Sequence, residues 1–260
     1  MAELIIEKHQ GVGKIIISNP KKLNAMTLDM WLGIPKALQE FDQDNEIRVI
    51  VVEGAGDRSF ISGADIAQFD GLRDAQEAQD RYNDAVAGAY GAPIQCSKPV
   101  VAAIDGICFG GGLGFAAACD VRLSSSDAIF RMPAARLGLG YDPIGIKRFI
   151  DVIGLANTAD IFFSARQFNA NDAIQMGFVS QVFQKSDFHR QVDQYLQMVS
   201  ENAPLTMKAA KFAMKQYMED AANRNMALAT QMVVACYESE DYAEGRSAFA
   251  QKRVPNFKGR

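Results

Sequence analysis

The sequence predicts an α/β core followed by a helical extension at its carboxyl-terminal end. Short runs of aliphatic and β-branched residues alternate with helix-like segments over the first two thirds of the chain, whereas the last third is mostly helix-like. With 260 residues, of which 48% are hydrophobic and 22% charged, the chain has enough apolar material for a large core. The sequence contains no internal repeat, low-complexity tract or long linker.

The predicted elements follow one another in a regular order. A hairpin is expected first, ending at Asn19 and Pro20, and Thr27 is the expected N-cap of the first helix. Continuous apolar runs predict buried strands, and apolar residues at helical spacing predict helices. The strands are expected over residues 4–7, 14–18, 49–52, 99–104, 120–123 and 178–183. The helices are expected over residues 27–42, 74–90, 144–152 and 226–237, and from Pro204 onward.

Charge and cysteine content narrow the functional class. The formal net charge of −4 and the isoelectric point near 5.3 argue against a nucleic-acid groove or a generally basic membrane face. No stretch reaches the roughly 18 apolar residues of a membrane span, and the first residues lack the apolar run of a signal peptide. The four cysteines show no CxxC spacing, which indicates reduced thiols rather than disulfides or a zinc site. The expected location is cytoplasmic.

Two glycine-containing segments are candidates for binding a ligand through their backbone. In FISGADIAQF, Gly63 permits a turn, and the small Ala64 leaves its N–H group accessible; a strand-to-helix turn would give the same pattern. Residues 110–112 are glycines ahead of the helix-like LGFAAAC, where N–H groups meet the positive end of a helix dipole. Close helix–strand packing would also favour glycine there. Because Phe115 breaks GxGxxG and no phosphate loop is present, a nucleotide site is not expected.

With their surroundings these segments resemble the enoyl-CoA hydratase/isomerase (crotonase) superfamily over the whole chain. The resembling blocks occur in order as NPKKLNAMTLDM, GDRSFISGADIAQF, KPVVAAIDGICFGGGLGFAAACDVRLSSSDAIF, LGLGYDPIGIKRFIDVIG, SARQFNANDAIQMGFVSQVF and EGRSAFAQKRVPNF. The resemblance implies a crotonase-like spiral of ββα turns, with an acyl-CoA-binding core over residues 1–200 and a helical oligomerisation region over residues 201–260. It also implies a homotrimer or a dimer of trimers, and coenzyme A as part of the substrate with no further cofactor.

The resemblance assigns site residues position by position. The N–H groups of Ala64 and Gly111 are expected to form an oxyanion hole for the thioester oxygen and to stabilise an enolate; one such donor is typically worth about 3–4 kcal/mol of barrier. Near the carboxyl end, Lys252 and Phe257 are expected to reach the nucleotide part of CoA, in some members of the family across a subunit boundary. The other residues expected along CoA are Lys22, Leu23, Ala25, Ser62, Gly63, Asp65 and Ile66.

The sequence departs from the hydratases of this superfamily at both of their glutamates. Gly114 stands at the first position and Ala134 at the second. Two carboxylates suit the addition of water, because one can activate the water while the other delivers a proton to the α-carbon. Their replacement argues against ordinary hydration of an enoyl-CoA and favours a reaction that needs a single acid.

Asp142, in GLGYDPIG, is the remaining acid, at a position where other branches of the superfamily place a working carboxylate. As a base it would move a proton between carbons, as in an isomerase; as a nucleophile it would serve a hydrolase or a dehalogenase. Asp before Pro143 is also the pattern of a helix N-cap, and a capping carboxylate is a poorer base. Tyr141 is the neighbouring candidate, as a hydrogen-bond donor. A further alternative is a non-catalytic acyl-CoA-binding protein.

Overall fold

The computed structural model describes residues 2–65 and 76–260, and of residues 76–79 the backbone alone. The strands are β1 (Glu3–His9), β2 (Val12–Ser18), β3 (Val49–Gly54), β4 (Ser59–Ile61), β5 (Val100–Ile104), β6 (Ile107–Phe109), β7 (Val121–Ser125), β8 (Ile129–Arg131), β9 (Gln167–Asn169) and β10 (Gln181–Phe183). The longer helices are α1 (Leu28–Gln43), α3 (Gln76–Gln95), α4 (Gly111–Ala118), α5 (Pro143–Ser164), α6 (Ala170–Gln175), α7 (Phe188–Ser200), α8 (Pro204–Met218), α9 (Met226–Tyr237) and α10 (Glu240–Gln251). Short 3₁₀ turns are η1 (Pro20–Lys22), η3 (Ala134–Leu137), η4 (Lys185–Asp187) and η5 (Ala221–Asn223).

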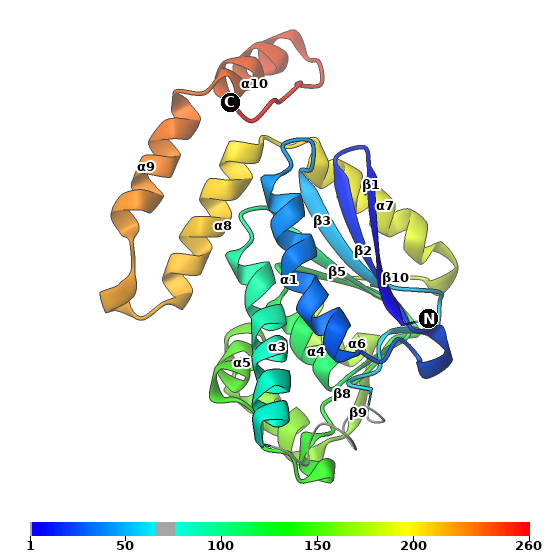
Figure 1. Ribbon diagram of the computed structural model, residues 1–260. Helices are drawn as coiled ribbons and strands as arrows, with labels where there is room; N and C mark the ends of the chain where they lie inside the picture. The colour runs from blue at the N-terminus through cyan, green and yellow to red at the C-terminus, as the bar shows by residue number, and fades with distance from the viewer. Residues whose placement is uncertain (1, 66–75) are drawn as a thin grey trace.

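Within the described residues the strands form two sheets, in the orders β1-β2-β3-β5-β7-β10 and β4-β6-β8-β9 (Figure 1). Apart from the β1–β2 hairpin and the β8–β9 pair, neighbouring strands are parallel. The chain steps from the larger sheet to the smaller one at β3–β4, β5–β6 and β7–β8, and each step is followed by a helix. This repeated ββα step is the spiral that the sequence predicted.

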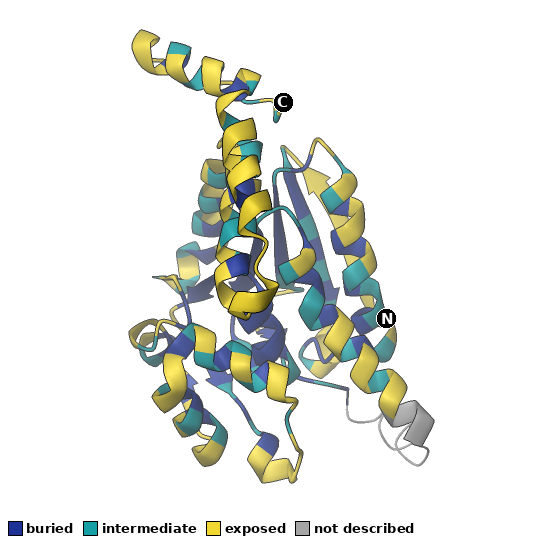
Figure 2. Ribbon diagram, turned by 90° about the vertical axis from the view of Figure 1, so that its left-hand side faces the viewer, coloured by how far each residue is buried: buried dark blue, intermediate teal, exposed yellow. Residues whose placement is uncertain are grey.

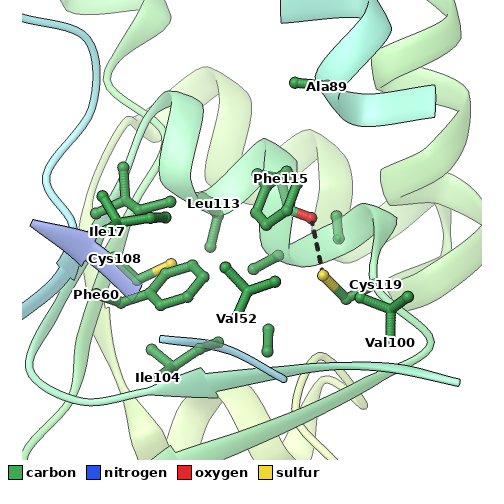
Figure 3. Close-up of a cluster of buried hydrophobic side chains, with 14 of the residues drawn as sticks. Ile17, Val52, Phe60, Ala89, Val100, Ile104, Cys108, Leu113, Phe115 and Cys119 are labelled. Atoms are coloured by element: carbon green, nitrogen blue, oxygen red, sulfur yellow. Dashed lines mark hydrogen bonds between the residues drawn. The ribbon is translucent and has the colours of Figure 1, made fainter. Parts of the chain in front are cut away.

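The core occupies both faces of the larger sheet. Ile50 and Val52 pack on the side of α1, whereas Val49 and Val51 point to the opposite face, where α7 covers them. Figure 3 shows how the cluster on the α1 side continues to the smaller sheet: Phe115 of α4 lies there beside residues from several strands. The other residues that the figure labels are Ile17, Val52, Phe60, Ala89, Val100, Ile104, Cys108, Leu113 and Cys119.

The cysteines behave as buried apolar residues. All four are free, and only Cys236 is partly exposed. The Cys119 thiol contacts the Phe115 carbonyl oxygen (3.6 Å), and burial raises the pKa of Cys119 to about 12. The prediction that the cysteines are mostly buried is confirmed, whereas their reduced state stays a prediction.

The carboxyl-terminal helices form the predicted extension. α8 is attached to the core through Lys211, whose ammonium donates to the Asp120 carboxylate (2.6 Å) and to two backbone carbonyl oxygens. α9 and α10 project from the core, and most of their residues are exposed (Figure 2). Their exposed apolar side chains are Met226, Leu228, Val233, Val234, Tyr237, Tyr242 and Phe249.

Several predicted boundaries differ from those of the structure. The strand predicted over residues 178–183 begins only at Gln181, because the N–H groups of Phe178 and Val179 turn inward and donate to the Ala173 carbonyl (2.8 and 3.3 Å). The helix predicted over residues 144–152 continues as α5 beyond a kink at Gly154, where φ is +76°. The three-residue strands of the smaller sheet were not predicted, because they are too short to show an alternating pattern.

Candidate active site

The two glycine-containing segments leave neighbouring parallel strands at the same edge of the smaller sheet. Ile61 of β4 is in register with Cys108 of β6, so the residues after them continue side by side. Gly63 has a φ of +122°, which favours glycine, and a Cβ atom there would lie 3.7 Å from the Phe109 carbonyl oxygen. The topology therefore places the Ala64 and Gly111 segments beside each other.

The Ala64 N–H group points away from Met26, the residue with which Ala64 forms a β-bridge. Met26 N donates to Gly63 O and Asp65 N donates to Met26 O (both 2.9 Å), which forms an isolated parallel bridge between Met26 and Ala64. In this pattern the N–H of the central residue points away from its bridge partner. Among the residues that the structure describes, the Ala64 N–H has no hydrogen-bond acceptor.

Gly111 opens α4. The first helical hydrogen bond runs from Gly114 N to Gly110 O (3.0 Å), so the Gly111 N–H lies ahead of it at the positive end of the helix. α4 lies directly against β4: the backbone at Gly112 is so close that a Cβ atom there would overlap the Ile61 carbonyl oxygen. Glycine at position 112 thus permits the close approach that brings Gly111 to the end of β4.

The first two CoA-binding segments predicted from the sequence also lie together. The Lys22 ammonium contacts both oxygens of the buried Asp65 carboxylate (2.8 and 2.7 Å). Ser62 Oγ donates to Lys22 O (3.1 Å), and Ser62 N donates to Leu23 O (3.2 Å). Ala25 is buried, and its carbonyl accepts from the Asn19 amide (2.9 Å). Ile66 lies outside the described residues.

The structure does not bring the last two predicted CoA residues to this place within one chain. Lys252 is the exposed C-cap of α10. Phe257 lies near Arg48, whose Nη2 donates to the Phe257 carbonyl oxygen (3.4 Å). Arg48 directly precedes the amino end of β3, whereas Ala64 follows the carboxyl end of β4, the next strand along the chain. Phe257 therefore lies beside the start of this pair of strands and Ala64 after its end.

Two phenol groups occupy the space beside Gly114. A Cβ atom there would lie 2.5 Å from Tyr141 Oη and 2.6 Å from Tyr90 Oη. Tyr90, on α3, donates to the Gly111 carbonyl oxygen (3.0 Å), and its ring is edge-on to Trp31 (5.8 Å between centroids). The space that a glutamate side chain at position 114 would take in a hydratase, according to the resemblance, is therefore occupied here by the hydroxyl groups of Tyr90 and Tyr141.

Both phenols are neutral at pH 7, and burial raises their pKa values further. Burial raises the pKa of Tyr141 to about 12 and the pKa of Tyr90 well above its ordinary value. The Arg148 guanidinium lies 5.6 Å from the ring centroid of Tyr90, and burial lowers its pKa. Neither Tyr90 nor Arg148 was predicted from the sequence, because no local pattern marks their contact with each other. Only Gly114 could have indicated that a distant side chain fills its space.

Asp142 is an exposed N-cap. Its carboxylate accepts from Gly145 N (3.2 Å), and Pro143 occupies the first helical position of α5. The capping interpretation is confirmed, whereas the chemical role of Asp142 stays a prediction. Ala134 is buried at the start of η3 and offers no ionisable group. Over residues 2–65 and 76–260, no cluster of His, Cys, Asp and Glu suits a metal ion and no helix could cross a membrane.

The sequence pattern of enoyl-CoA hydratase/isomerase matches residues 7–260. The chain belongs to the enoyl-CoA hydratase/isomerase family. It is 32% identical to the peroxisomal Delta(3,5)-Delta(2,4)-dienoyl-CoA isomerase of Arabidopsis thaliana, over 97% of this chain and 95% of that protein. It is 30% identical to the crotonyl-CoA hydratase of Syntrophomonas wolfei, over 98% and 97% of the two chains.

Solved structures of family members confirm the crotonase-like fold. An enoyl-CoA hydratase/carnithine racemase from Magnetospirillum magneticum superposes with a TM-score of 0.92 at 29% identity, covering all of this chain and 97% of that one. The chain is therefore an acyl-CoA enzyme of the enoyl-CoA hydratase/isomerase family, as the sequence predicted. Its relatives include both hydratases and an isomerase, so family membership leaves the reaction open.

Proposed function

We propose that the enzyme converts an acyl-CoA thioester by holding its enolate oxygen on the N–H groups of Ala64 and Gly111, with Asp142 carrying the proton. The observation that supports this most directly is the Ala64 N–H, which has no acceptor among the described residues beside the start of α4. Fixed N–H dipoles stabilise negative charge that develops on oxygen without reorganising, which is the requirement of enolate chemistry.

Isomerisation of a double bond fits these side chains better than hydration. Gly114 and Ala134 supply no carboxylate, and the phenols beside Gly114 are neutral donors at pH 7, with pKa values that burial raises further. In an isomerisation one base removes a proton from the second carbon of a 3-enoyl group and returns it to the fourth carbon of the dienolate, so that no water is activated. Asp142, as the remaining carboxylate, would make both transfers, and the reaction would need no metal or redox cofactor.

The test separates the charge of Asp142 from its capping role. Asn and Ser both cap helices well, so Asp142→Asn and Asp142→Ser should keep the protein folded while removing the base. Interconversion of 3-enoyl-CoA and 2-enoyl-CoA should fall by about 10²–10⁴-fold in both variants. Asp151→Asn, which removes an ion-paired carboxylate from the same helix, is the matched control and should keep full turnover.

Other outcomes would select other functions. Full turnover in Asp142→Asn would refute the role of Asp142. A covalent acyl or aryl adduct on Asp142, detected by mass spectrometry, would favour a hydrolase or a dehalogenase. Tight binding of acyl-CoA without turnover of any thioester would favour a binding protein.

We also propose that residues 201–260 assemble the chain into a homotrimer or a dimer of trimers, in which Lys252 and Phe257 reach CoA across a subunit boundary. The apolar side chains that α9 and α10 leave exposed, with Phe249 88% exposed, support an interface there. Sedimentation velocity measures the state directly, and a monomer at micromolar concentration would contradict this proposal.

A further inference from the structure

Tyr141 holds a buried hydroxyl group that interacts with the Tyr90 hydroxyl, but its own proton has no acceptor in hydrogen-bond geometry among the described residues. Its ring is packed edge-on against Phe162 (5.1 Å between centroids) and against Gly145, where a Cβ atom would overlap it. This packing fixes the direction of the hydroxyl group toward Gly114. A buried donor that finds no acceptor destabilises the protein, so such a group is expected to be used in another state.

Tyr90 leaves Tyr141 as the available donor of the pair. The Tyr90 hydroxyl has one proton, and it is directed to the Gly111 carbonyl oxygen at 3.0 Å. The two phenols are close enough to influence each other's pKa values. Arg148 lies over the Tyr90 ring and partly offsets the rise that burial causes in the pKa values of both phenols.

The position of the Tyr141 hydroxyl beside Gly114 indicates which part of a bound acyl chain it could contact. Gly114 follows Gly111 by three residues of α4, and a helix rises about 1.5 Å per residue, so the two positions are about 4.5 Å apart along the axis. If the thioester oxygen lies at the Gly111 N–H and the acyl chain runs along α4, its third or fourth carbon comes to the turn that holds Gly114, and hence to the Tyr141 hydroxyl.

We propose that Tyr141 selects an acyl-CoA whose acyl chain carries an oxygen acceptor, a carbonyl or a hydroxyl group, on its third or fourth carbon. This inference rests on the proposed function, because it takes the thioester oxygen to be held at Ala64 and Gly111. The donated hydrogen bond would satisfy the buried phenol. An acyl chain with a methyl group at that point would leave the hydroxyl unsatisfied, and sites built to donate a hydrogen bond discriminate strongly against such analogues.

The test is equilibrium binding by titration calorimetry of two thioester pairs that differ by oxygen against methyl. One pair is 3-oxobutanoyl-CoA and 3-methylbutanoyl-CoA, and the other is 4-oxopentanoyl-CoA and 4-methylpentanoyl-CoA. The full-length wild-type protein should bind the oxo member of at least one pair about tenfold more tightly than its methyl partner. In Tyr141→Phe the ratio should fall to about one through weaker binding of the oxo member alone.

Tyr195→Phe is the matched control. Tyr195 is a half-buried phenol on α7, on the opposite face of the larger sheet, and its removal should leave both ratios unchanged. Equal affinities within both pairs in the wild type would overturn the inference while leaving the acyl-CoA site intact. A preference that persists in Tyr141→Phe would overturn the assignment to Tyr141. Failure of all four thioesters to bind would overturn this inference and the proposed function together.

Discussion

The close packing around Gly114 predicts how Gly114→Ala changes the free energy of unfolding. In Gly114→Ala the new methyl group would meet Tyr141 Oη at 2.5 Å, Tyr90 Oη at 2.6 Å and Tyr90 Cζ at 2.8 Å, which is too close without movement. Overpacking of this kind costs about 1–3 kcal/mol. Alanine in a helix is favoured over glycine by about 0.5–1 kcal/mol, so the net fall in the free energy of unfolding should be about 1 kcal/mol and at most about 2.5 kcal/mol.

The assay is urea unfolding followed by circular dichroism, with all proteins at one concentration because assembly would change the apparent stability. Gly88→Ala is the matched control: Gly88 lies in α3, and its Cβ would meet nothing within 4 Å. It should raise the free energy of unfolding by about 0.5–1 kcal/mol. Tyr141→Phe removes one of the obstructing oxygens, so the double variant should regain at least about 0.5 kcal/mol. A gain in Gly114→Ala equal to that in Gly88→Ala would refute the packing argument.

Three further predictions concern the support of the site and the extension. Gly112→Ala should destabilise the protein by more than about 2 kcal/mol and abolish thioester binding, because the backbone carbonyl that it would overlap cannot rotate away; wild-type affinity for CoA thioesters would contradict this. Lys211→Met should cost about 2 kcal/mol in urea unfolding at pH 7, since the partly buried Asp120 loses its cation. Burial already raises the pKa of Asp120, so that loss should shrink as the pH falls and the carboxyl group becomes protonated; a loss independent of pH would count against the ion pair. The Arg253 guanidinium lowers the pKa of Glu244 to about 2, so this ion pair is fully formed above the ordinary pKa of a glutamate and is lost as the pH falls through about 2. In an NMR titration, Arg253→Gln should return the pKa of Glu244 toward about 4.3. An unchanged pKa would show that Arg253 does not cause the shift.

The sequence predicted what local chemistry determines. Thr27 caps α1 by accepting from Met30 N (3.3 Å), and Asp142 with Pro143 starts α5, because caps depend on adjacent residues alone. The two glycine segments were predicted as neighbours only through the resemblance, since their approach depends on the pairing of β4 with β6. Tyr90 is about twenty positions before Gly111 in the chain, and nothing near either residue marks their contact.

Where the resemblance expects the two glutamates of a hydratase, Gly114 and Ala134 supply no carboxylate, which changes the number of ionisable groups rather than the polarity of the site. Beside Gly114 the polar atoms come from Tyr90 of α3 and from Tyr141, two residues before α5, as hydroxyl groups whose pKa values burial raises further above neutral pH. Such groups donate hydrogen bonds but do not take up protons at neutral pH. In the proposed reaction one carboxylate therefore remains to accept a proton, and the proton that it removes is the one it has to give back. Hydration needs a base for water and an acid for carbon at the same time, whereas moving a double bond uses one group twice in succession.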